Sequence, residues 1–289
     1  MPNHAEHKKI IPFLKTSVNA LLENKVILFP FALVAFVQLF IIEILYFSPR
    51  YPLNVFFGPI ISKIWSPAYL EYPLNFLLLP KMFQYSQMPI YIFVSSFFIA
   101  VAVGIIAAIN ADQKVNIGAI IKKTFSSYVH LIVAAIISFA LVAVLFKLFG
   151  LVFTRAAQIR STTGHFFMIK SIVMGGAPYF QLLLSIFATT LFAYVIPAIV
   201  IDNKKVFSAL MVNFKSLKGA FWFTFFIVLT PSLLFMPILL LRNSIPLDFF
   251  APELRLMTLV FSVFVMVLID AIIYTAVTSF YLVKKEENS

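Results

Sequence analysis

An acidic residue lies in the middle of the last long apolar stretch of this 289-residue chain. Asp270 stands in the run VFVMVLIDAIIYTAV, 14 residues from both Leu256 and Lys284. If this stretch crosses a membrane, an Asp at its centre costs about 2.5–3.5 kcal/mol on insertion scales, so it should face other helices. Two interpretations stay open: a site that couples a proton or cation to transport, or a neutral carboxyl group that hydrogen-bonds between helices.

Two polar residues of the first long apolar stretch are candidates for the same site. Gln38 lies at a depth similar to that of Asp270, and Glu43 lies nearer the outer end of the stretch. We therefore predict an intramembrane polar site that includes Asp270, Gln38 and Glu43. Thr189 and Thr190, in the fourth stretch, are further candidate partners of Asp270.

Basic residues gather between the third and fourth apolar stretches. The net charge over residues 147–174 is +4, from Lys147, Arg155, Arg160 and Lys170 with no acidic residue. Arg binds phosphate through two parallel hydrogen bonds, whereas Lys acts as a point charge. We predict that Arg155, Arg160 and Lys170 contact an anionic headgroup; a solvated loop of chance composition is the alternative. Lys147 could instead pair with Glu43.

The chain offers few residues from which a metal site or an active site could be built. It has no Cys and four His, none of them at ligand spacing. It contains no Gly-rich phosphate loop, no Gly-x-Ser-x-Gly turn and no His-Glu-x-x-His sequence. The 11 acidic residues lie mostly in loops and tails. We therefore expect no catalytic residue, no metal and no cofactor, and a protein that is not an enzyme.

The composition is that of a chain in contact with lipid. Hydrophobic residues make up 62% of the sequence and charged residues 11%, and 35 residues are Phe. The mean hydropathy is +1.01. Ordinary soluble domains carry about 25% charged residues. We predict an all-α integral membrane protein that forms a single membrane domain over residues 1–289.

Six stretches are long enough to cross a bilayer, which takes about 20 apolar residues in a helix. They cover about 26–47, 89–109, 128–150, 176–201, 219–241 and 256–283. An even number of spans places both termini on one side, where 13 of the 22 Lys and Arg residues fall. Because Lys and Arg are more abundant in cytoplasmic connections, we expect both termini in the cytoplasm.

An amphipathic segment precedes each odd-numbered span. In the third segment, apolar residues recur at three- and four-residue intervals: Val206, Phe207, Leu210, Met211, Phe214 and Leu217. Lysines lie mainly on the other face, and Asp202 is a candidate N-cap. The second segment aligns with it at an offset of 90 residues, with Asp112 opposite Asp202, and a weaker version opens the chain. This pattern is typical of helices in the membrane interface.

We therefore predict three parallel repeats, each of a cytoplasmic interfacial amphipathic helix followed by two transmembrane helices. Repeat 1 covers about 8–109, repeat 2 about 112–201 and repeat 3 about 202–285. The alternative is that short basic connections in membrane proteins resemble one another by composition alone.

The first outer connection, about 48–88, is long and apolar. It is interrupted by Pro52, Pro59, Pro67, Pro73 and Pro80. Because proline breaks regular helix hydrogen bonding, we expect short helices and turns at the outer leaflet here, not a span.

Residues 197–222 resemble part of a six-span membrane domain that some bacterial glycerophosphodiester phosphodiesterases carry beside their catalytic barrel, and that also occurs in stand-alone membrane proteins. The likeness lies in Pro197-Ala198, Asp202, Ala209-Leu210, Leu217, Gly219 and Phe221-Trp222. Where that family often has Ser-Trp, this chain has Asn213-Phe214. No stretch falls outside the membrane plan, so phosphodiesterase activity is not carried over. The resemblance implies a bacterial inner-membrane protein that acts near lipids or their precursors.

Three functional hypotheses follow. The first is a non-enzymatic polytopic inner-membrane protein that binds or organises anionic lipid or an envelope precursor, with membrane lipid as its partner and no role for nucleic acid. The second is a small-solute or ion-coupled transporter that uses Asp270. The third is an assembly partner of another membrane complex. The sequence leaves a protein partner or a homo-oligomer open.

Overall fold

The structure is a computed structural model that describes residues 9–159, 164–244 and 252–287. All secondary structure in these residues is helical. Within them, six helical runs are long and apolar enough to cross a membrane: Lys25–Phe47, Leu74–Asn110, Tyr128–Ala157, Gly164–Ile201, Phe221–Leu241 and Pro252–Glu287. The prediction of an all-α chain with six candidate spans is confirmed.

Several candidate spans contain more than one helix. The first joins a 3-10 turn to α2 (Leu28–Phe47), and the fourth joins α8 (Gly164–Leu191) to α9 (Val195–Ile201). The third and the sixth are single helices, α7 (Tyr128–Ala157) and α13 (Pro252–Glu287). The fifth joins α11 (Phe221–Ser232) to α12 (Met236–Ser244) through the 3-10 turn η5 (Leu233–Phe235). Pro231 lies just before this turn, and a proline at such a point removes a helix hydrogen bond.

The second candidate span begins well before the predicted residue 89. It runs through α4 (Leu74–Pro89), the π-helical turn η4 (Ile90–Ser95) and α5 (Ser96–Asn110). Pro80 and Pro89 lie inside the run without ending it. The helix continues because a π-helical turn follows Pro89 and because α2 and α13 pack along α4. Only the first part of the outer connection therefore forms the predicted short helices, α3 (Asn54–Ile64) and η3 (Pro67–Leu70).

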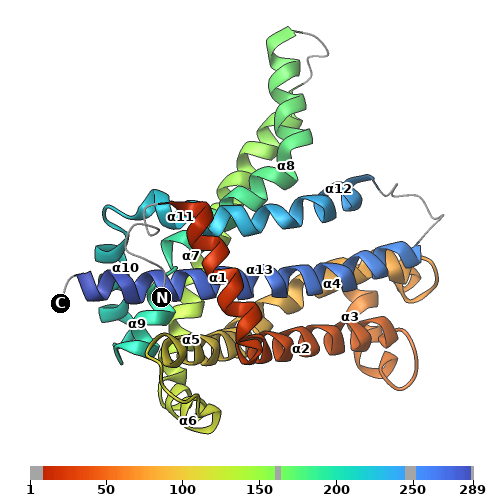
Figure 1. Ribbon diagram of the computed structural model, residues 1–289. Helices are drawn as coiled ribbons and strands as arrows, with labels where there is room; N and C mark the ends of the chain where they lie inside the picture. Colours follow the sequence, from red (N-terminus) through yellow and green to blue (C-terminus); the bar gives the residue numbers. More distant parts are fainter. Residues whose placement is uncertain (1–8, 160–163, 245–251, 288–289) are drawn as a thin grey trace.

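Three short helices directly precede the odd-numbered spans: α1 (Ile10–Glu23), α6 (Ile117–Ser126) and α10 (Val206–Leu217). Together with α9 and the carboxyl end of α13 they lie at one end of the bundle, on the left in Figure 1. Helix α3 and the start of α13 lie at the opposite end. We call these the terminal end and the outer end.

Helix α10 presents apolar residues on two faces. Val206, Ala209 and Leu217 are buried against the bundle, whereas Phe207 and Met211 are 74% and 61% exposed. The apolar stripe read from the sequence is therefore divided between a protein-facing side and an exposed side.

Two buried clusters hold the bundle together. The larger one lies at the terminal end and includes small residues of α5, α9 and α13 with no exposed surface, among them Ala100, Ala198 and Ala276. The smaller one joins α2, α4 and α13 toward the outer end and includes Ala35, Leu79 and Val263. The hairpin of α7 and α8 projects away from these helices (Figure 1).

Candidate functional site: a cavity among the candidate spans

A cavity of about 620 Å³ lies among α2, α4, α5, α7, α8, α9 and α13. We call it the central cavity. Residues of α7 and α8 supply part of its walls, and residues of α4 and α13 supply another part. Cavities of about 300–1,000 Å³ are typical of small-molecule sites.

The walls of the central cavity combine an apolar surface with a set of polar side chains. The polar residues are Gln38, Gln84, Gln87, Tyr91, Ser95, Ser96, Ser138, Ser185, Thr189, Ser262, Asp270 and Tyr274. Among the described residues, no Lys, Arg or His lines the cavity. The cavity lining described by the structure therefore contains one carboxyl group, that of Asp270, together with amide and hydroxyl groups.

Asp270 is half-buried on α13 and lines the central cavity. Tyr91, Ser138 and Tyr274 line the same cavity, and Tyr274 lies four residues after Asp270 on α13. In the described part of the chain, Asp270 has neither a hydrogen-bond partner nor an ion-pair partner. A role as a hydrogen-bonded link between helices would need such a partner, so the geometry favours a carboxyl group that is available to the cavity.

The predicted polar site is assembled in part. Gln38 and Thr189 line the central cavity with Asp270, as their depth in the sequence suggests. Glu43 is exposed on α2 and does not line it, and no ion pair joins Glu43 to Lys147 within the described residues. Thr190 is fully buried and donates a hydrogen bond to the carbonyl of its own helix at Ile186, over 2.8 Å.

Several polar residues of the cavity were not expected from the sequence. Gln84 and Gln87 lie in α4, within a segment assigned to the outer connection, and the Nε2 of Gln87 is buried without a partner in the described structure. Their three-residue spacing, which puts two amides on one face of an apolar helix, is a signal that could have found them. Tyr274 follows Asp270 by four residues, about one helical turn, and shares its face for the same reason.

The central cavity reaches the surface of the bundle through its side. Gln84, Met88, Ala143 and Met266 line it and are also exposed. These residues come from α4, α7 and α13 and lie inside candidate spans. The opening is therefore lateral, at a level where lipid would surround the helices.

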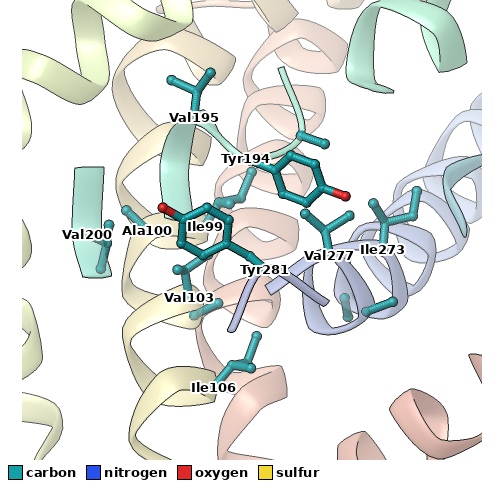
Figure 2. Close-up of a cluster of buried hydrophobic side chains, with 14 of the residues drawn as sticks. Ile99, Ala100, Val103, Ile106, Tyr194, Val195, Val200, Ile273, Val277 and Tyr281 are labelled. Carbon is teal, nitrogen blue, oxygen red and sulfur yellow. The ribbon is translucent and has the colours of Figure 1, made fainter. Parts of the chain in front are cut away.

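The end of the cavity nearest the chain termini is filled by a buried cluster, which we call the cavity floor. Figure 2 shows its members: Ile99, Ala100, Val103, Ile106, Tyr194, Val195, Val200, Ile273, Val277 and Tyr281. Ile99, Val195 and Val277 also line the cavity, and the rings of Tyr194 and Tyr281 stack with centroids 5.8 Å apart. The floor separates the cavity from the terminal end by closely packed apolar side chains.

Beyond the floor, Asp202 joins α13 to the connection between α9 and α10. Its Oδ2 accepts a hydrogen bond from the Tyr281 hydroxyl over 2.5 Å, and its Oδ1 pairs with Lys285 Nζ over 2.5 Å. We call these three residues the Asp202 clamp. The prediction that Asp202 caps α10 is wrong: the N-cap residue is Lys205, and no side chain caps that helix end.

Arg155 and Lys170, two of the residues predicted to bind an anionic headgroup, do not line the central cavity. Arg155 is exposed near the end of α7, and Arg160 lies outside the described residues. Lys170 Nζ donates a hydrogen bond to the carbonyl of Ile159 over 3.1 Å. Lys170 therefore joins the two helices of the hairpin, since the carbonyls at the end of α7 lack partners within their own helix.

A smaller cavity, of about 220 Å³, lies between α4, α12 with η5, and α13. We call it the basic cavity because Lys81 and Arg255 line it. Gln84 and Ser262 line both cavities, so the two adjoin each other. Its basic residues lie near the start of α13 and in the first half of α4, which places it toward the outer end.

Comparison with known proteins gives no relative from which a function could be transferred. No protein-family model matches the chain, and neither the curated proteins nor the solved structures contain a match. The functional argument therefore rests on the fold and the two cavities.

Proposed function

We propose that this protein is a membrane transporter that binds a small amphipathic molecule in the central cavity, with Asp270 as its polar anchor. One observation carries the proposal: a cavity of about 620 Å³ among the candidate spans brings Asp270 together with Gln38, Gln84 and Gln87. Amides and a carboxyl group inside a membrane are costly unless they meet polar partners. A ligand with polar groups would supply those partners.

The shape of the cavity is consistent with transport. It is open at its side and closed toward the terminal end by the cavity floor and the Asp202 clamp. A transporter that works by alternating access must close one end of its site while the other is open. The lateral opening suits a molecule that enters from the lipid, because its apolar part would already lie in the bilayer.

The proposal is tested by filling the cavity. Ser138→Trp places an indole in it, whereas Val144→Trp places the same group on an exposed position of the same helix. Small molecules and lipids that co-purify with the wild type and with each variant are identified by mass spectrometry. We expect at least one compound of the wild type to be present in Val144→Trp and absent from Ser138→Trp. Size-exclusion chromatography checks that both variants fold. Identical profiles for all three proteins would contradict the proposal.

Binding of an anionic lipid is a second candidate function, and the basic cavity favours it. Lys81 and Arg255 lie toward the outer end, where a phosphate of the outer leaflet would be within reach. Arg in particular suits phosphate, since its guanidinium donates two parallel hydrogen bonds. The hairpin residues Arg155, Arg160 and Lys170 are the other candidate location. If the basic cavity binds the lipid, the amount of anionic lipid that co-purifies should decrease in the double variant Lys81→Gln, Arg255→Gln. If the hairpin binds it, the amount should decrease in the triple variant Arg155→Gln, Arg160→Gln, Lys170→Gln.

We also propose a bacterial inner-membrane location with both termini in the cytoplasm, and three repeats related about the membrane normal. One feature of the two connections supports the repeats: each contains a left-handed residue, Asp112 at φ 52° between α5 and α6 and Asn203 at φ 51° between α9 and α10, although the two differ by one position in the alignment at an offset of 90 residues. Three exposed apolar residues of α10, Phe207, Met211 and Phe214, support an interfacial position for that helix. Membership of the resembling six-span family, and assembly with another membrane complex through the projecting hairpin, remain proposals of the same kind.

A further inference from the structure

We propose that the ligand of the central cavity is an organic cation, a molecule with an apolar body and one positive charge such as a protonated or quaternary amine. The inference rests on the proposed function and adds the chemical class of the ligand. It is carried by three features of the cavity: its charge, its hydrogen-bond acceptors and its aromatic walls.

The charge of the lining has one sign. Asp270 is the acidic residue of the cavity, and no basic side chain lines it within the described residues. An unpaired carboxylate in a low-dielectric site is unfavourable, and a cation beside it relieves that cost. An anionic ligand would meet the same carboxylate with repulsion and would find no basic group to bind it.

The chain does not supply such a cation from the adjoining cavity. Arg255 lies on the same helix as Asp270 but 15 residues earlier, which corresponds to about 22 Å along the axis at 1.5 Å per residue. Lys81 lines the basic cavity with Arg255 and not the central one. Among the described residues, no basic side chain of either cavity balances Asp270, so a ligand that carries a positive charge is favoured over an anionic one.

The remaining walls suit the rest of a cationic ligand. The side-chain carbonyls of Gln38, Gln84 and Gln87 can accept hydrogen bonds from an ammonium group. Aromatic rings line the cavity: Phe83, Tyr91, Phe139, Phe146, Phe192 and Tyr274. The face of an aromatic ring attracts a cation, most strongly where both groups are removed from water. These rings also pack against an apolar ligand body.

The test uses two probes of matched shape and opposite charge, tetraphenylphosphonium and tetraphenylborate. Binding of each labelled probe to the full-length protein in nanodiscs is measured by equilibrium dialysis, and the signal of protein-free nanodiscs is subtracted. Asp270→Asn removes the charge without changing the size of the side chain. Glu43→Gln is the matched control, since it removes an acidic charge from an exposed position in another candidate span, outside the cavity.

We expect the wild type to bind tetraphenylphosphonium at least about tenfold more tightly than tetraphenylborate, a difference of about 1.4 kcal/mol. Asp270→Asn should remove this preference, and Glu43→Gln should keep it. Equal binding of the two probes, or a preference that survives Asp270→Asn, overturns the inference.

The ligand class and the proposed function fail in different ways. If a compound is lost from Ser138→Trp but carries no positive charge, the cavity binds a ligand and only the cation inference is overturned. If neither probe binds and Ser138→Trp loses no compound, both the inference and the proposed function are overturned.

Discussion

Asp202 and Asp112 occupy aligned positions in the sequence but have different surroundings in the structure. Asp202 is 15% exposed and contacts Tyr281 and Lys285, whereas Asp112 is exposed and has no side-chain partner among the described residues. The Lys285 side chain is 54% exposed, so its ion pair contributes little to stability. Most of the effect of Asp202 should therefore come from the short hydrogen bond with Tyr281, since bonds to charged groups are the stronger ones.

We predict that Asp202→Asn lowers the free energy of unfolding by about 1–2 kcal/mol, because an amide replaces the charged acceptor of the Tyr281 hydroxyl. Asp112→Asn should leave stability unchanged, since asparagine tolerates the left-handed conformation at this position as well as aspartate does. Thermal unfolding of both variants in the same detergent measures the difference. Equal losses in the two variants would show that the clamp contributes nothing specific.

At the scale of elements, the break between α8 and α9 depends on one buried side chain of α10. Helix α8 ends at Leu191 and α9 begins at Val195, so the intervening turn leaves backbone groups without helical partners. The amide of Asn213 meets two of them: its Oδ1 accepts from Tyr194 N over 2.9 Å, and its Nδ2 donates to Leu191 O over 2.7 Å. Asn213 is one of the positions at which the chain differs from the resembling family.

We predict that Asn213→Ala destabilises the protein by about 2–4 kcal/mol, because the buried N–H of Tyr194 and the part-buried carbonyl of Leu191 each lose their partner. Asn213→Asp should also be destabilising, since a carboxylate can accept from Tyr194 but cannot donate to Leu191. Phe214→Leu, at the neighbouring position that is 53% exposed, is the control and should have little effect. Thermal unfolding of the three variants decides; an Asn213→Ala variant as stable as the control would exclude this role.

At the scale of the whole molecule, buried side chains close the central cavity toward the terminal end. The cavity floor lies on that side of the cavity, and the Asp202 clamp lies beyond the floor. Lys284 adds a hydrogen bond from its Nζ to the carbonyl of Ser216 on α10. These contacts join the carboxyl end of α13 to α9 and α10, and their release is the first step that opening toward the terminal end would require.

The absence of Cys from the chain makes this arrangement directly measurable. A single cysteine at Ala143, in the cavity wall and exposed, should react readily with a small methanethiosulfonate reagent, whereas one at Val103, in the floor and fully buried, should react slowly. Adding Asp202→Asn should increase the rate at which the cysteine at position 103 reacts by about 5- to 30-fold. This factor corresponds to a loss of about 1–2 kcal/mol in the free energy that keeps the floor closed. Adding Asp112→Asn should not. An unchanged rate with Asp202→Asn would show that the clamp does not hold the floor closed.

The sequence by itself determined the helical architecture and the candidate spans, because hydropathy over about 20 residues is a local property. It also identified Asp270 and Gln38, since a polar residue deep in an apolar stretch must face other helices. The family resemblance, the repeats and the cytoplasmic location of the termini stay predictions that neither the fold nor the cavities test.

Only the tertiary structure decided which polar residues share a site. Glu43 and Gln38 lie five positions apart on α2, yet only Gln38 lines the cavity, because the rotation of the helix against its neighbours selects the inward face. Gln84 and Gln87 join the site because α4 continues into α5 despite its prolines. The partners of Asp202, Tyr281 and Lys285, lie 79 and 83 residues further along the chain. Such contacts depend on how distant helices pack, and no local pattern of residues encodes that packing.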